Sequence, residues 1–152
     1  MRLQHFTTLL FALILHICPA TAQKSQQDST TQVPVAFCGQ LYNKEYDVFM
    51  KIDFVKQQLV APGHELYGSL AGYMGRPYNS FYWVMLTAEV KGQTATMQLV
   101  NDFGSEDLMA TLTMLNDSTY RFSQGKGSVI KVPNKGKWLK LPKTLDFKLK
   151  TP

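Results

Sequence analysis

The chain has 152 residues, of which 45% are hydrophobic and 18% charged, and its formal net charge is +5. This length fits one domain that is large enough to bury a core of its own. The net charge is too small to indicate a class of partner, and only two cysteines and three histidines are available for disulfide, metal or catalytic chemistry.

The first 22 residues predict a cleavable signal peptide. Arg2 gives a positive start, residues 6–17 are mostly apolar, and Ala20 and Ala22 stand where a signal peptidase reads small residues. A membrane-spanning helix needs about 20 apolar residues, so this segment is too short to be one. We therefore expect an exported protein, periplasmic or extracellular, with no transmembrane segment after cleavage.

Removing this leader changes the residues available for chemistry. Cys18 goes with it and Cys38 remains alone, which excludes an intrachain disulfide in the mature protein. His64 becomes the single histidine. We expect Cys38 to be buried, because it stands in the apolar, strand-like segment VAFCGQL. The alternative location is a lipid anchor on Cys18, although Ile17 before it is not the small residue that lipoprotein processing uses.

Alternation of apolar and polar residues predicts β-strands through most of the remaining chain. Residues 23–32 are almost wholly polar and predict a flexible tether, followed by a single β domain at 33–152. Eight strands are expected, at 35–42, 46–55, 64–74, 81–90, 93–101, 108–115, 119–123 with 127–132, and 144–149. Turn residues such as Lys91-Gly92 separate them, and a short helical turn is expected at 105–107. The pattern predicts an all-β fold, an antiparallel meander that closes or nearly closes into a barrel, with a β-sandwich as the alternative.

The strand expected at 81–90 is apolar on both faces at its start, so a loop, a helix or a ligand should cover its second face. Aromatic residues and glycines also gather just before it, as they would in a site for a carbohydrate or a small apolar ligand. The same residues could instead fill the barrel core. The candidate ligand-binding residues are Tyr67, Tyr73, Tyr78, Tyr82 and Trp83.

Lysines dominate the last quarter of the chain, where Asp146 is the single acid after Lys126. Such a basic, aromatic surface could meet an anionic glycan, an envelope surface or an acidic protein. The alternative is that the lysines keep edge strands from pairing with other sheets. Nucleic acid is not expected, because the chain is exported and has no recognition motif. The candidate partner-binding residues are Lys131, Lys135, Lys137, Trp138 and Lys140.

Few residues are available for catalysis or metal binding. His64 follows Pro62-Gly63 and could act as a lone general base, or it could be a surface residue. The segment from Asn101 to Asp107 carries three carboxylates that could hold calcium, but their spacing is not that of an EF-hand, and a locally capped turn is the alternative. One cysteine and one histidine do not make a usual zinc site, and no cofactor is expected.

Two family resemblances accompany this pattern. A single β domain behind a signal peptide, with Gly136 and Trp138 in a G-x-W motif, resembles small lipocalin-like or avidin-like barrels. In lipocalins that motif opens the first strand, whereas here it comes near the end. The opening FCGQLYNKEYDVFMKIDF, the glycine-tyrosine strands and the late G-x-W also resemble uncharacterised exported β proteins of Bacteroides-type bacteria. This resemblance implies a secreted or cell-envelope location and carries no activity.

Three hypotheses for the function follow. The first is a non-enzymatic module that binds a small ligand or glycan through the aromatic residues. The second is a protein-interaction or inhibitor module whose lysine-rich C-terminal face docks an acidic partner. The third is a small hydrolase or isomerase built on His64.

Overall fold

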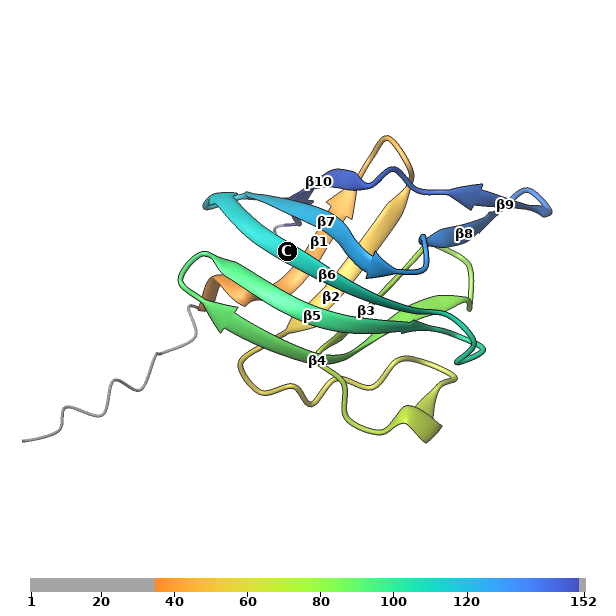
Figure 1. The fold of residues 1–152 in the computed structure, drawn as a ribbon, viewed down its shortest axis with the longest axis horizontal. Coiled ribbons are helices and arrows are strands. Elements are labelled where there is room, and N and C mark those ends of the chain that lie inside the picture. The colour runs from red at the N-terminus through yellow and green to blue at the C-terminus, as the bar shows by residue number, and fades with distance from the viewer. Residues whose placement is uncertain (1–34, 151–152) are drawn as a thin grey trace, which may run out of the picture. The chain divides into compact units, whose positions relative to one another are not determined.

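The structure is a computed structural model in which residues 35–150 are described (Figure 1). The expected signal peptide, the tether and Cys18 lie outside these residues. No helix of the described part is long and apolar enough to cross a membrane.

Ten strands and two short 3-10 helices make up the described part of the chain. The helices are η1 (Val35–Phe37) and η2 (Glu65–Tyr67). The strands are β1 (Cys38–Asn43), β2 (Val48–Asp53), β3 (Gly72–Gly75), β4 (Tyr82–Lys91), β5 (Thr94–Asn101), β6 (Asp107–Asn116), β7 (Thr119–Gly127), β8 (Lys131–Asn134), β9 (Lys137–Lys140) and β10 (Thr144–Leu149).

Eight of these strands form a closed antiparallel barrel in the order β1-β10-β7-β6-β5-β4-β3-β2. Each strand pairs with its neighbour in sequence except where β8 and β9 form a separate hairpin between β7 and β10 (Figure 1). The prediction of an all-β, closed antiparallel meander is thus confirmed, and the sandwich alternative is wrong.

Side chains fill the barrel interior. The alternation in β5 sends Ala95, Met97 and Leu99 inward, as the sequence pattern predicts. Large side chains such as those of Trp83 and Phe122 are fully buried there. Residues at the base of the β8–β9 hairpin join the same core cluster and close one end of the barrel: Ile130, Val132 and Leu141. The interior of the barrel is therefore a packed core.

A second, smaller apolar cluster lies on the outer face of β3 and β4. Ala61 and Leu70, from the long connection between β2 and β3, pack there on Tyr73 and Val84. This confirms that the second apolar face at the start of β4 is covered, and the cover is a loop.

Two segments differ from the sequence prediction because local hydrogen bonds bend the chain. A strand at 64–74 is wrong over most of its length: the amides of Tyr67 and Gly68 bond back to the carbonyls of His64 and Glu65, and β3 begins at Gly72. The helical turn at 105–107 is also wrong, since β6 already begins at Asp107.

The start of β1 and the region after β7 also differ. Cys38 is exposed rather than buried, because the inward positions of β1 are Leu41 and Asn43. Strand β7 runs without interruption to Gly127, and the β8–β9 hairpin that follows it was not predicted.

Candidate functional site

The β8–β9 hairpin is tied to the turns at one end of the barrel, which we call the hairpin end. Arg76, from the β3–β4 connection, donates Nη1 to the carbonyl of Pro133 (3.0 Å) and to the side chain of Asn134 (2.7 Å). Its Nη2 donates to a carboxylate oxygen of Asp47 in the β1–β2 turn, at 3.1 Å. The Arg76 guanidinium thus ties strand β8 and the β1–β2 turn to the β3–β4 connection through charge-assisted hydrogen bonds.

An open cleft of about 250 Å³ lies at this end, lined by Phe81, Asn101, Phe103, Ser105, Glu106, Lys131 and Trp138, and we call it the aromatic–lysine cleft. The Phe81 ring lies 4.9 Å from the Trp138 ring and 5.6 Å from the Phe103 ring. Phe81 is buried, but Phe103 is 73% and Trp138 55% exposed. Lys131 Nζ lies 3.0 Å from Glu106 Oε1 across the cleft. Two aromatic faces and an ion pair are therefore open to a ligand.

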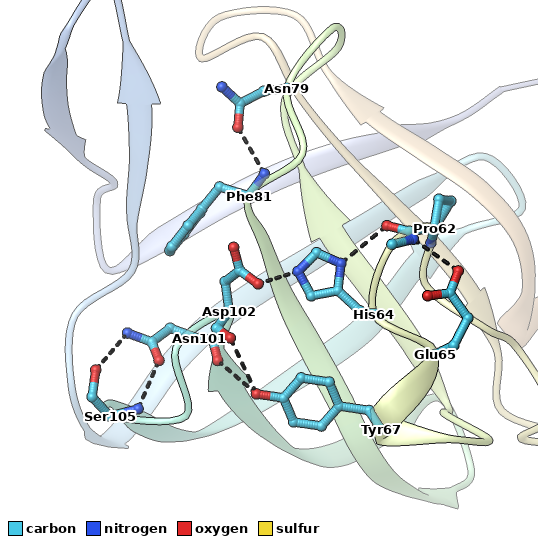
Figure 2. A network of polar contacts seen from close by, with 10 residues as sticks. Pro62, His64, Glu65, Tyr67, Asn79, Phe81, Asn101, Asp102 and Ser105 are labelled. Carbon is cyan, nitrogen blue, oxygen red and sulfur yellow. Dashed lines mark hydrogen bonds and ion pairs between the residues drawn. The ribbon is translucent and has the colours of Figure 1, made fainter.

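Local hydrogen bonds to backbone amides fix the segments that carry Phe81 and Phe103, and Figure 2 shows those of Asn79 and Asn101. The Asn101 side chain is 3% exposed, and its Oδ1 accepts the amides of Ser105 (3.0 Å) and Glu106 (3.3 Å), which fixes the turn that presents Phe103. The side chain of Asn79 accepts the Phe81 amide at 2.8 Å. The segment from Asn101 to Asp107 is therefore a turn capped by its own first residue.

His64 bridges the β2–β3 connection to the same turn (Figure 2). Its Nδ1 bonds the carbonyl of Pro62 at 3.0 Å, and its Nε2 bonds the carboxylate of Asp102. Both partners are acceptors, so the doubly protonated imidazolium satisfies both bonds at once. The hydroxyl of Tyr67 lies 3.3 Å from the carbonyl of Asp102 and reinforces the bridge.

The surroundings of His64 favour its charged form. Partial burial lowers its pKa, but the bond to the Pro62 carbonyl, the bond and charge of Asp102 and the charge of Glu65 together raise the pKa above its usual value. While both bonds are made, neither ring nitrogen has a lone pair to accept a proton from a substrate. In this structure His64 therefore links two loops.

The five predicted ligand-binding residues do not share one surface. Trp83 is fully buried in the core and donates its indole N–H to the carbonyl of Lys131 at 3.0 Å. Tyr73 is 6% exposed in the outer cluster. Tyr67 and Tyr82 pack beside His64, whereas the exposed Tyr78 lines a separate cleft. Burial makes Trp83 and Tyr73 packing residues rather than the walls of a ligand site.

The five predicted partner-binding residues all lie on the β8–β9 hairpin, and all are exposed: Lys131, Lys135, Lys137, Trp138 and Lys140. The candidate residues included neither Phe81 nor Phe103, which complete the cleft with Trp138. An aromatic residue inside the polar segment NDFGSED was the available signal for Phe103.

Two of the three carboxylates of this turn bond other side chains. Asp102 bonds His64, and Glu106 bonds Lys131. Across residues 35–150, no three His, Cys, Asp or Glu side chains gather in a way that could hold a metal ion.

Comparison with models of protein families, with curated proteins and with solved structures gives no match to this chain. The resemblances to lipocalin-like barrels and to exported Bacteroides-type proteins therefore stay predictions.

Proposed function

We propose that this protein is an exported, non-enzymatic binding module that holds an anionic glycan in the aromatic–lysine cleft. The observation that carries the proposal is the exposure of Phe103 and Trp138 beside Lys131 in a preformed concave surface. Aromatic rings offer flat apolar faces to the C–H faces of sugar rings, and the exposed Lys135 and Lys137 of the same hairpin attract a carboxylate or sulfate. Ser105 and Glu106 supply polar atoms for hydroxyl groups.

The filled barrel supports a site on the outside. Core side chains occupy the interior, and the hairpin base closes the end above them. The cleft is instead held by the buried side chain of Asn101 and by Arg76, so little ordering is needed when a ligand binds.

Protection of sheet edges does not by itself account for the hairpin. Lysines and Pro133 on a two-stranded sheet do discourage pairing with other sheets. Edge protection does not require Trp138 to pack on Phe81 while leaving 55% of its surface exposed. A concave site that contains Glu106 also suits sugar hydroxyls better than a flat anionic membrane.

The test is binding of a heparin-derived octasaccharide, with neutral maltooctaose as the uncharged probe, measured by isothermal titration calorimetry. We expect the anionic probe to bind and Trp138→Ala to weaken it about tenfold or more, since losing a central aromatic contact costs about 1.4 kcal/mol or more. Tyr78→Ala is the matched control, because Tyr78 is exposed in a different cleft, and it should leave the affinity unchanged. Equal loss in both variants, or binding to vesicles of anionic phospholipid without binding to the octasaccharide, would overturn the proposal.

A further inference from the structure

We infer that the ligand is a polyanionic chain that crosses the base of the β8–β9 hairpin into a second subsite, an inference that rests on the proposed function. The aromatic–lysine cleft is about 250 Å³, which is below the range of about 300–1,000 Å³ that complete small-molecule sites occupy. It therefore holds only part of a ligand.

The second subsite is an open cleft of about 590 Å³ on the other side of the hairpin base, which we call the lysine cleft. Its lining includes Tyr46, Gln124, Ser128, Val129, Lys140 and Lys143. Both lysines are exposed, and neither forms an ion pair within residues 35–150. The lining residues include no carboxylate. The cleft is thus positively charged, whereas the charge of Lys131 in the first cleft is balanced by Glu106.

The register of the hairpin connects the two clefts. Lys131 lines the aromatic–lysine cleft, Lys140 lines the lysine cleft, and the two are directly opposite each other in the β8–β9 ladder. Directly opposed residues of an antiparallel pair have neighbouring side chains on the same face. Lys131, which is paired with Glu106, therefore lies beside Lys140 at the hairpin base, and Lys140 and Lys143 carry the charge that no ion pair within residues 35–150 balances.

The wall of the lysine cleft is held in place before a ligand arrives. Gln124 is 5% exposed, its Oε1 accepts the amide of Ile130 at 2.7 Å, and its Nε2 donates to the carbonyl of Pro142 at 2.7 Å. At Gly127, a Cβ atom would lie 2.4 Å from the carbonyl oxygen of Asp107, so the backbone there can approach β6 only without a side chain. A rigid wall lowers the ordering cost of binding.

The experiment compares a heparin-derived disaccharide with a heparin-derived decasaccharide by isothermal titration calorimetry. We expect wild-type protein to bind the decasaccharide more tightly. The double variant Lys140→Ala, Lys143→Ala should bind the decasaccharide about tenfold more weakly, a loss of about 1.4 kcal/mol, and should bind the disaccharide as wild type does. Trp138→Ala should weaken both probes, because both occupy the aromatic–lysine cleft.

The matched control is the double variant Lys51→Ala, Lys56→Ala, which removes the same charge from exposed positions on and just after β2. An equal loss in this control would show that net charge alone attracts the decasaccharide and would overturn the second subsite. The inference also falls if Lys140→Ala, Lys143→Ala weakens both probes equally or neither. In those outcomes the proposed function survives, because the loss of disaccharide binding in Trp138→Ala tests the aromatic–lysine cleft independently of the second subsite. If wild-type protein binds neither probe, both proposals fail together.

Discussion

His64 shows how one side chain can make the attachment of a loop depend on pH. The β2–β3 connection is fastened to the β5–β6 turn through the imidazole, which bonds the Pro62 carbonyl on one side and the Asp102 carboxylate on the other. The charged groups that face it are Asp102 and Glu65, both acidic, and the rings of Tyr67 and Tyr82 pack on it. The environment therefore stabilises the imidazolium.

The sign of the pH dependence follows from the raised pKa of His64. A raised folded-state pKa means that the stabilisation is fully present below the unfolded-state value, about 6.5, and is lost as pH rises through the folded-state pKa. At pH 5.5 we expect the free energy of unfolding of the wild-type protein to exceed that of His64→Gln by about 1–2 kcal/mol, a modest value because water partly screens both His64 and Asp102. At pH 8.5 the difference should be smaller, because the imidazolium has lost its proton. Urea unfolding at the two pH values measures this difference.

Asp102→Asn is the control for that prediction, because it keeps a hydrogen-bonding side chain but removes the charge that faces His64. Its stability should change less between pH 5.5 and pH 8.5 than that of the wild type. A wild-type stability that rises relative to His64→Gln over the same interval would contradict the assignment of the bridge.

The sequence could predict which positions alternate but not what each face meets. Trp83 and Tyr82 are neighbours on β4 and must point to opposite faces. The structure sends Trp83 into the barrel and leaves Tyr82 outside beside His64. Aromatic residues suit a core and a binding surface equally well, so composition alone could not separate Trp83 from Trp138. That difference depends on the β8–β9 hairpin, which the sequence analysis did not identify.

At the scale of elements, the strands that were predicted well are those with long unbroken alternation and clear turns. Strand β5 and strand β6 are examples, since each sends every second residue into the core. The prediction failed at 64–74, where Leu66 and Tyr67 suggest a strand although Gly68 adopts a φ of 67° and the chain turns. It also missed the β8–β9 turn at Lys135-Gly136, both with positive φ, because the surrounding lysines were interpreted as a charged surface.

The attachment of the β8–β9 hairpin gives a prediction at this scale. Arg76→Gln removes the bonds to Pro133, Asn134 and Asp47, so the hairpin should open more often while the barrel stays folded. Because hydrogen bonds to charged groups contribute about 1.5–3 kcal/mol, we expect exchange of the amide hydrogens in residues 131–140 to accelerate about tenfold or more. Hydrogen exchange measured by NMR reports each amide separately.

Arg121→Gln is the matched control for Arg76→Gln. Arg121 is likewise paired with an aspartate, since two of its nitrogens lie 2.8 and 2.9 Å from the carboxylate oxygens of Asp146, but it joins β7 to β10 on the barrel wall. Exchange in residues 131–140 should be unchanged in this variant. Equal acceleration in the two variants would mean that general destabilisation, rather than loss of the clamp, frees the hairpin.

At the scale of the whole molecule, closure of the barrel separates the groups that stabilise the fold from those proposed to bind. Each of the eight barrel strands pairs on both sides, so within residues 35–150 the unpaired sheet edges belong to the β8–β9 hairpin. Stability therefore comes from a packed interior, while the exposed aromatic and basic groups at the hairpin end are available for a ligand. Changes in the two regions should have independent effects.

Phe122 and Phe103 allow this independence to be measured with the same substitution. Phe122 is fully buried, with its ring 6.4 Å from that of Phe147, so Phe122→Ala should lower the free energy of unfolding by about 3–5 kcal/mol through lost burial and a residual cavity. Phe103 is 73% exposed, so Phe103→Ala should change stability by only about 0.5 kcal/mol or less.

Binding of the heparin-derived octasaccharide should show the opposite order. Phe103→Ala should weaken binding, whereas the folded fraction of Phe122→Ala should bind the octasaccharide as the wild-type protein does. If instead affinity for the octasaccharide fell in proportion to stability in both variants, the site would depend on the barrel as a whole, and the hairpin end would not be a separable binding surface.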